Sequence, residues 1–155
     1  MSNHPVRIFT DGAASGNPGP GGYGIVMKYG SHEKEFSKGF RHTTNNRMEL
    51  LAVIDALKKL NRNGLNVVVY SDSKYVVDAV EKKWVFSWQK VGFKKKKNPD
   101  LWKDFLVEYA KHNVIFKWVK GHAGHPENER CDQLAVEASQ NAENIDSNFE
   151  NGLSG

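Results

Sequence analysis

The apolar residues of this chain change their spacing part-way along it, and this change limits the folds that are possible. Three short runs typical of β-strands come first, at residues 6–11, 23–29 and 35–41. Residues 15–22, rich in Gly and Pro, separate the first two runs, and residues 30–32 separate the last two. Because Pro lacks a backbone donor and Gly is unrestrained, both segments predict turns. We expect an antiparallel meander of three strands, with a turn directly after the first run.

The spacing then becomes helical. Leu50, Val53, Ile54 and Leu57 fall at i, i+3, i+4 and i+7, which predicts an amphipathic helix over residues 46–61. Further along, the predicted elements are a strand over residues 66–72, a helix from Ser73 through Trp84, a helix from Asn98-Pro99, a strand over residues 114–119 and a helix from Pro126. A meander followed by alternating helices and strands predicts an α/β fold with a mixed sheet and helices on its faces.

Length and composition exclude several classes of protein. A chain of 155 residues fits one domain, which we place at residues 1–140. Residues 141–155 carry acids but few large apolar side chains, which predicts a disordered tail. No apolar run approaches the roughly 20 residues of a membrane span. The single Cys131 and the lack of a signal segment favour the cytoplasm.

Positive charge is concentrated in one part of the chain. Residues 82–98, here called the lysine segment, contain no acid, whereas acids outnumber basic residues elsewhere. Its basic residues are Lys82, Lys83, Lys90, Lys94, Lys95, Lys96 and Lys97. A solvated loop would also carry such charge, but an uninterrupted cluster favours binding to phosphates of a nucleic acid.

Four acids are candidates for a functional site. Asp11 and Asp72 each end a predicted strand, and if these strands are parallel neighbours, both carboxylates lie at the sheet edge that binds ligands. Either could instead form a turn or cap a helix. Glu49 lies within the apolar face of its helix, although it could form a capping box with Asn46. Asp132, taken alone, is a surface residue near a helix N-terminus.

The four acids carry more information as a set. Two carboxylates 4 Å apart repel by about 1 kcal/mol in water and about 4 kcal/mol at an effective dielectric of 20. A cation must offset this repulsion, and oxygen ligands select hard ions such as Mg²⁺ or Mn²⁺. Two such ions about 4 Å apart activate a water and stabilise a leaving oxygen in phosphoryl chemistry. The set therefore predicts a phosphate ester as substrate.

The histidines and one glycine-rich run could also carry chemistry. His122 and His125 precede Cys131, but this order matches no common zinc site. His125 comes before Pro126, where an imidazole could carry protons near neutral pH or simply bond at the helix start. Residues 19–24 fit G-x-G-x-x-G but precede a strand, which argues against dinucleotide binding.

Four blocks resemble bacterial-type ribonuclease HI, of the type 1 ribonuclease H family. They are Ile8–Gly19, Thr43–Leu50, Tyr70–Tyr75 and Trp118–Asp132, in that order along the chain. The resemblance implies the ribonuclease H-like fold, an α/β fold with a five-stranded mixed sheet and helices on both faces. It also implies endonucleolytic hydrolysis of the RNA strand of an RNA·DNA hybrid, leaving 5′-phosphate and 3′-hydroxyl ends.

The resemblance assigns roles to the candidate residues. The family's catalytic acids fall on Asp11, Glu49, Asp72 and Asp132, the acids reached from position alone. Asp11 would bridge two Mg²⁺ ions, with Mn²⁺ able to substitute, and Glu49 and Asp72 would complete one site each. Asp132 would help to hold the ion beside the attacking water. His125 matches the family's flexible-loop histidine, implicated in proton transfer or product release.

Contacts with the hybrid also carry over. Some positions of the family face the minor groove of the hybrid, where 2′-hydroxyls mark the RNA strand. In this chain these positions are occupied by Gly12, Asn17, Asn45 and Lys74. Lys74 departs from the Gln often found there. Thr44 matches a residue that grips a DNA-strand phosphate. The family's basic protrusion corresponds to residues 82–99, with Trp84 and Trp102 at its base and Lys94 to Lys97 concentrating the charge.

Three functions remain to be separated. The leading hypothesis is a Mg²⁺-dependent hybrid ribonuclease that acts as a cytoplasmic monomer. A second is a module that binds hybrid or double-stranded RNA with an idle site, although retained, mutually repelling acids cost stability. The third is a nuclease or integrase-like enzyme that cuts DNA with the same acids.

Overall fold

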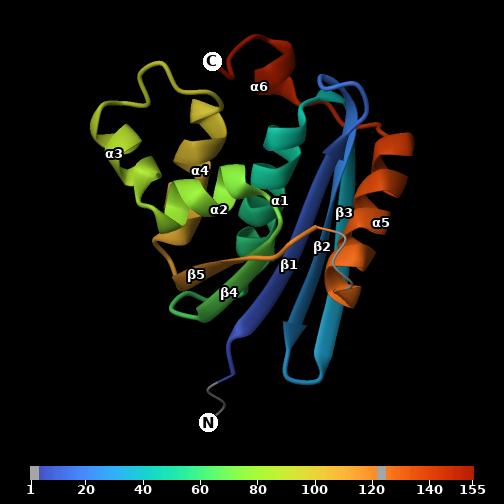
Figure 1. Cartoon of the computed structure of the whole chain (residues 1–155), viewed down its shortest axis with the longest axis vertical. Coiled ribbons are helices and arrows are strands. Elements are labelled where there is room, and N and C mark those ends of the chain that lie inside the picture. The colour runs from blue at the N-terminus through green and yellow to red at the C-terminus, as the bar shows by residue number, and fades with distance from the viewer. Residues whose placement is uncertain (1–3, 122–124) are drawn as a thin grey trace.

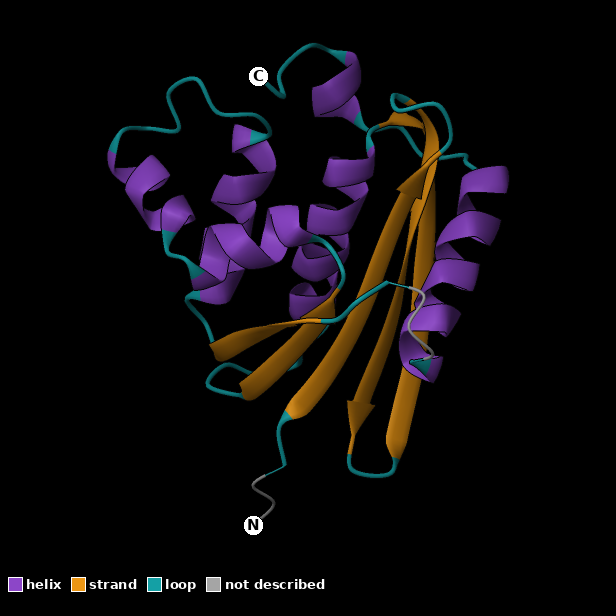
Figure 2. Cartoon of the chain, viewed as in Figure 1, coloured by secondary structure: helices purple, strands orange, loops and turns teal. Residues whose placement is uncertain are grey.

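A single sheet forms the centre of the computed structural model, which describes residues 4–121 and 125–155 (Figures 1 and 2). Its strands are β1 (Val6–Ala14), β2 (Gly19–Tyr29), β3 (His32–Thr43), β4 (Asn66–Ser71) and β5 (Asn113–Trp118). Their order across the sheet is β3-β2-β1-β4-β5. The pairs β1–β2 and β2–β3 are antiparallel, whereas β4 runs parallel to both β1 and β5. The predicted meander and the predicted five-stranded mixed sheet are confirmed.

Helices cover both faces of the sheet, as the resemblance implied (Figure 1). They are α1 (Asn45–Lys58), α2 (Lys74–Glu81), α3 (Trp84–Lys90), α4 (Pro99–Tyr109), α5 (Pro126–Gln140) and α6 (Ser147–Glu150). Helices α1 to α4 lie on one side and α5 lies on the other (Figure 2). Across the described ranges, no helix is long and apolar enough to cross a membrane.

The hydrophobic core is divided unequally by the sheet. The larger part lies beneath α1, α2 and α4, where Ile8, Leu50, Ile54 and Trp102 are fully buried. The smaller part lies beneath α5 and consists of Phe9, Val26, Cys131 and Leu134, with Tyr70 packed against them. The apolar spacing that predicted α1 is therefore explained by burial, because Leu50, Val53, Ile54 and Leu57 all face the larger core.

Helix α5 lies so close to β2 and β3 that three strand positions, Gly22, Gly24 and Gly39, have no room for a side chain. A Cβ atom at Gly24 would lie 2.3 Å from the main-chain oxygen of Cys131, and one at Gly39 would lie 1.9 Å from that of Ala138. Any larger residue would push α5 away from the sheet. Because Gly24 pairs with Asp11 in β1, this contact brings the first turns of α5 next to Asp11.

Asp11 lies inside a strand, although the sequence predicted that a turn would follow it. Strand β1 continues to Ala14 because its pairing with β2 continues there, with Asp11 opposite Gly24 and Ala14 opposite Gly21. The turn instead falls within residues 15–18, between the two strands. Asp72 directly follows the end of β4, as expected.

The helix predicted from Ser73 through Trp84 is two helices. Ser73 caps α2 by accepting a hydrogen bond from the backbone N–H of Val76, but α2 ends at Glu81. Lys83 then adopts a left-handed conformation, with φ of 67°, and α3 begins at Trp84. A left-handed residue cannot continue an α-helix, so the chain changes direction here and buries Val85 against the core.

The expectation of a disordered tail is wrong for the segment after α5. Asn144 forms a bridge with Phe40, and its main-chain oxygen accepts a hydrogen bond from the N–H of Arg41, 2.9 Å away. Asp146 is buried and accepts a 2.7 Å bond from Nε of the buried Arg47. The segment is held by polar contacts rather than by apolar burial, and its composition therefore gave no sign of order.

Candidate active site

Three of the four predicted acids meet at one place. Asp11 comes from β1, Glu49 from the second turn of α1 and Asp72 from the residue after β4. Each offers a carboxylate oxygen, and these oxygens all lie within 4.8 Å of one another. The parallel pairing of Phe9 with Tyr70, continued by two residues, places Asp11 opposite Asp72. As predicted, Asp72 lies at the carboxyl end of β4. Asp11 lies opposite it in the neighbouring parallel strand β1, which continues beyond Asp11 to Ala14.

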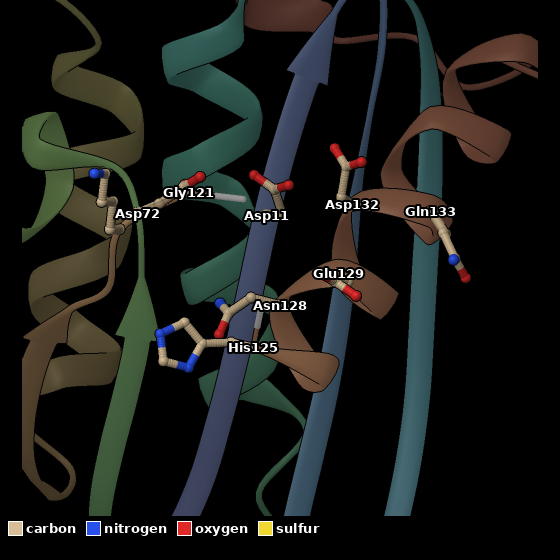
Figure 3. Close-up of a pocket in the computed structure, with 9 residues that line it drawn as sticks. Asp11, Asp72, Gly121, His125, Asn128, Glu129, Asp132 and Gln133 are labelled. Atoms are coloured by element: carbon tan, nitrogen blue, oxygen red, sulfur yellow. The ribbon is translucent and has the colours of Figure 1, made fainter. Parts of the chain in front are cut away.

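The fourth acid stands beside this group. Asp132, in the second turn of α5, lines the same two pockets as Asp11 and Asp72 but does not belong to the close group of three (Figure 3). The position of α5 against Gly24 sets its distance from Asp11. An acid on a separate helix is therefore placed to act next to the three, not among them.

Burial and mutual repulsion perturb the acids. Burial is the main cause that raises the pKa of Asp11 to about 7, and the charges of Asp72 and Asp132 add to it. Burial also raises the pKa of Glu49 well above its usual range, with the charges of Asp11 and Asp72 contributing. Both shifts have the same meaning, because the site disfavours several negative charges in the absence of a cation.

The site fits a divalent cation. Glu49 is only 5% exposed, and its Oε1 atom is buried with no hydrogen-bond partner among the described residues. A buried carboxylate oxygen without a donor is costly, and a bound cation would satisfy it. The donors are all carboxylate oxygens, which are ligands typical of hard ions rather than of the softer transition metals. We therefore identify Asp11, Glu49 and Asp72 as a candidate metal-binding group.

Several predicted hybrid contacts lie around the acids. Of the two pockets that Asp11, Asp72 and Asp132 share, one is also lined by Glu49 and by Gly12, Asn45 and Lys74. Asn17 lies next to Asn45, because its Oδ1 accepts a 2.9 Å hydrogen bond from the N–H of Asn45. Thr44 is the N-cap of α1, and its Oγ1 accepts from the N–H of Arg47. The fold thus brings Gly12, Asn45 and Lys74 to the acidic site, with Asn17 and Thr44 next to Asn45.

Gly12 has a structural reason for being glycine. A Cβ atom there would lie 2.5 Å from the main-chain nitrogen of Glu49. A side chain would therefore push α1 away from β1, and Glu49 would move with it.

The predicted basic protrusion consists of α3 and the loop that follows it. Lys94, Lys95, Lys96 and Lys97 are all exposed on this loop. Its two ends are fixed, because Phe93 and Asn98 are buried and Asn98 Nδ2 donates to the hydroxyl of Tyr75 at 2.9 Å. Phe93, Lys95 and Asn98 adopt left-handed conformations, which gives the loop its tight course.

The lysines of the loop differ in their surroundings. Lys97 Nζ donates to the main-chain oxygen of Gly155 at 2.8 Å, and Lys96 Nζ lies 5.0 Å from the centre of the Trp88 ring. Trp84, at the base of the protrusion, is 47% exposed and carries Lys82 Nζ 5.2 Å above its ring. Trp102, also predicted at the base, is instead fully buried in the core.

The loop histidines are only partly described. His125 is exposed, lines the acidic pocket and is the N-cap of α5, without a side-chain capping hydrogen bond (Figure 3). His122 lies outside the described residues. Cys131 is buried in the smaller core, where its S–H donates to the main-chain oxygen of Phe9 at 3.1 Å.

Sequence reasoning missed several pocket residues. Lys120, Gly121, Asn128, Glu129 and Gln133 line the same pocket as Asp11 and Asp132. The first four lie in the Trp118–Asp132 block that was recognised as a motif without roles for these positions, and Gln133 directly follows it. The spacing on α5 was the available signal, because Asn128 and Glu129 fall one helical turn before Asp132.

Comparisons with known proteins agree with this geometry. The model of the RNase H family matches residues 3–140. The ribonuclease H of Desulforamulus reducens is 59% identical over 140 residues, which cover 87% of this chain and 87% of that relative.

Solved structures give the same result. The crystal structure of LC9-RNase H1, a type 1 RNase H with the type 2 active-site motif, has a TM-score of 0.79 at 32% identity, covering 92% of this chain and 75% of that one. LC11-RNase H1, solved in complex with RNA/DNA hybrid, has a TM-score of 0.65 at 29% identity, covering 88% of this chain and 97% of that one. With the family model and the relative above, these likenesses show that the chain belongs to the ribonuclease H family.

Proposed function

We propose that this chain is an endonuclease that hydrolyses the RNA strand of RNA·DNA hybrids and leaves 5′-phosphate and 3′-hydroxyl ends. The observation that carries the proposal is the convergence of Asp11, Glu49 and Asp72 within 4.8 Å, with Asp132 beside them. Membership of the ribonuclease H family and the likeness to LC11-RNase H1, which was solved with a hybrid, support the choice of substrate.

The acids are proposed to hold two Mg²⁺ ions when substrate is bound, with Mn²⁺ able to substitute. Such ions supply a water of lowered pKa and stabilise the negative charge of the leaving oxygen. Asp11 would contact both ions, Glu49 and Asp72 would contact one each, and Asp132 would help to hold the ion beside the attacking water. The orphan Oε1 of Glu49 and the raised pKa of Asp11 support this assignment, because both favour a bound cation.

His125 is proposed to carry a proton near the reacting phosphate or to help product leave. Its exposure at the rim of the acidic pocket and the absence of a side-chain capping bond leave its imidazole available. The chain offers a direct comparison, because His122 lies three positions earlier in the same block. His125→Ala should lower kcat more than His122→Ala does. The reverse result would move the role to His122.

Hybrid binding is proposed to use the residues around the acids and the lysine segment. Gly12, Asn17, Asn45 and Lys74 are assigned to the minor groove, Thr44 to a DNA-strand phosphate, and Trp84 with Lys94 to Lys97 to the backbone beyond. We also propose a single catalytic domain over residues 1–140 that acts as a cytoplasmic monomer. All four acids come from one chain, so the site needs no second copy.

A strand-labelled cleavage assay tests the proposal. RNA·DNA, RNA·RNA and DNA·DNA duplexes of one sequence would each be incubated with Mg²⁺ and with EDTA. We expect cleavage of the RNA strand of the hybrid alone, only with Mg²⁺, and with 5′-phosphate products. Equal cleavage of duplex DNA would favour the DNA-cutting alternative. Tight hybrid binding without cleavage in any metal would favour a binding module.

A further inference from the structure

We infer that Trp118 and Gly121 are positioning residues for Asp72. Trp118 holds the main chain of Asp72, and Gly121 leaves the space that its carboxylate occupies. This inference rests on the proposed function, in which Asp72 holds a metal ion. Both residues lie in the Trp118–Asp132 block, which was recognised as a motif but left without roles at these positions.

The contact of Trp118 begins where the pairing of β4 and β5 ends. Ser71 is the last residue of β4 and pairs with Trp118, and the N–H of Val119 donates to the Ser71 oxygen at 2.9 Å. The next main-chain oxygen, that of Asp72, receives the indole N–H of Trp118 at 3.1 Å. A side-chain donor therefore extends the hydrogen bonding by one residue beyond the strand and reaches the residue that carries the catalytic carboxylate.

The same indole ring also contacts a predicted substrate residue. Lys74 Nζ lies 4.9 Å from the centre of the Trp118 ring, and Lys74 lines the pocket that contains the four acids. Trp118 is nevertheless 46% exposed, so burial of apolar surface does not explain its position fully. Its specific contacts are to two residues of one segment, Asp72 and Lys74.

Gly121 lies against the carboxylate of Asp72. A Cβ atom at Gly121 would lie 2.7 Å from Oδ2 of Asp72, and the next nearest atoms, at 3.6 and 3.7 Å, also belong to the Asp72 side chain. The φ angle of Gly121 is not positive, so the backbone itself does not require glycine. Glycine is needed here because the Asp72 carboxylate occupies the space that a side chain would take.

This geometry makes Gly121→Ala a selective change. Among the described residues, the three atoms nearest to an added methyl group all belong to the Asp72 side chain, and the one in close contact is a carboxylate oxygen that can rotate away, so the fold should be retained. The situation at Gly12 is the opposite, because a methyl group there would meet the main chain of Glu49. Gly121→Ala therefore displaces one carboxylate, whereas Gly12→Ala would disturb the packing of a helix.

The expected effects follow from the precision that catalysis requires. Loss of a group that orients a metal ligand costs about 10- to 100-fold in metal affinity or activity. Trp118→Phe keeps the ring beneath Lys74 but removes the N–H, and Gly121→Ala moves the carboxylate directly. We expect each to lower the Mg²⁺ affinity of the substrate-free protein and kcat by about 10-fold or more, with KM for hybrid nearly unchanged.

The experiment measures three properties of the full chain. Mg²⁺ binding without substrate would be followed by calorimetry and by the NMR shift of the Asp72 amide, steady-state kinetics would give kcat and KM, and thermal unfolding would confirm the fold. Ile115→Ala is the matched control, because Ile115 is 51% exposed on the same strand and is distant from the acids in register. It should behave as the unchanged protein in all three measurements.

The outcomes separate the inference from the proposed function. Unchanged Mg²⁺ affinity and kcat in both variants, while Asp72→Asn abolishes cleavage, would overturn the inference alone. A change confined to KM would also overturn it, because Trp118 would then act on substrate and not on Asp72. If Trp118→Phe unfolds, Gly121→Ala still decides the question. Normal cleavage by Asp72→Asn would instead overturn the proposed function.

Discussion

The acidic site and the lysine segment carry opposite charges, and they differ in how far those charges are buried. The carboxylates of Asp11, Glu49 and Asp72 come from β1, α1 and the residue that directly follows β4, are buried or half-buried, and lie within 4.8 Å of one another. The ammonium groups of Lys94 to Lys97 stand on an exposed loop whose two ends are buried. Burial fixes the positions of the carboxylates but destabilises their charged forms. Solvent leaves the ammonium groups free to move and screens their charge.

The difference teaches how the two regions should divide the work. A reacting phosphate must be placed to within about 1 Å, which requires ligands on rigid elements. A polyanion is attracted over about 8 to 10 Å at physiological salt, which requires charge but not exact placement. Changes in the acidic site should therefore alter the rate of the chemical step, and changes in the lysine segment should alter binding.

The largest effect is expected from Asp72→Asn. Asparagine keeps the shape of the side chain but removes the charge that would hold a cation, so kcat should fall at least about 100-fold while hybrid affinity is retained. Single-turnover cleavage and a binding titration on the same hybrid measure both quantities. A variant that cleaves at a near-normal rate would contradict the assignment of the acidic site.

A large loss of stability is expected from Arg47→Ala, because Arg47 joins the two regions. It lies two residues before Glu49 and one of its terminal nitrogens pairs with Asp100, just after the lysine segment, at 2.7 Å. Nε pairs with Asp146 at the same distance, and only 2% of the side chain is exposed. Removing one partner of a buried ion pair costs about 3 to 5 kcal/mol of unfolding free energy, which urea titration would measure.

Arg41→Ala is the control for that change. Arg41 also pairs with an acid of the C-terminal segment, Glu150, but its side chain is 58% exposed. The urea midpoint of this variant should stay close to that of the unchanged protein, because solvent screens an exposed pair. Equal losses in the two variants would show that burial of Arg47 is not what makes its pairs important.

A smaller effect is expected from pH in the absence of metal. The folded protein binds the Asp11 proton more tightly than the unfolded chain, because its pKa rises from 3.8 to about 7. The contribution of Asp11 to stability is therefore complete below about pH 4 and is lost as the pH rises through about 7. Thermal unfolding in EDTA should show this decline, and Mg²⁺ should reduce it at neutral pH.

Asp11→Asn isolates that contribution. The variant cannot ionise at this position, so the melting temperature in EDTA should fall less between pH 4 and 7 than that of the unchanged protein. The difference between the two proteins is the quantity to follow, because ion-paired acids such as Asp100, whose pKa is lowered mainly by Arg47, titrate in both. Parallel curves would mean that folding does not raise the pKa of Asp11.

The smallest effect on the chemical step is expected in the lysine segment. Replacing Lys94 to Lys97 with Ala should weaken hybrid binding and flatten its dependence on salt, while kcat stays within a few-fold. Each phosphate contact contributes a slope of about 0.9, or less for a single strand. Because Lys96 and Lys97 already have partners within the protein, the slope should fall by about two and not four.

Two double variants sharpen that expectation. Changing Lys94 and Lys95 together should account for most of the lost salt slope, whereas changing Lys96 and Lys97 together should alter it less. An unchanged slope in the first pair would show that those lysines do not contact phosphate.

The sequence predicted the features that depend on local pattern. The apolar spacing of α1 was sufficient to find the helix and to mark Glu49 as an acid on a buried face, because a helix repeats every few residues. The acids Asp11 and Asp72 were found because they follow apolar runs. Their convergence needed one assumption, the parallel pairing of β1 and β4, and that pairing is present.

Features that depend on contacts between distant segments were not predictable. The extension of β1 beyond Asp11 results from pairing with β2, and the order of residues 141–155 results from Arg47 and Phe40. The break before Trp84 depends on one left-handed residue, Lys83, in a segment whose spacing alone fits a single helix. The hydrogen bond of Trp118 to Asp72 joins residues 46 positions apart and leaves no local pattern.

The placement of the C-terminal segment affects how the protein should be handled. The main-chain oxygen of Ser154 accepts from the N–H of Asn98 at 2.7 Å, and that of Gly155 accepts from Lys97. An affinity tag joined after Gly155 would therefore begin against the loop that carries Lys94 to Lys97, and an acidic tag there would compete with nucleic acid for the same ammonium groups. Strand β1 starts at the opposite end of the molecule, so a tag ahead of it would avoid this interference (Figure 1).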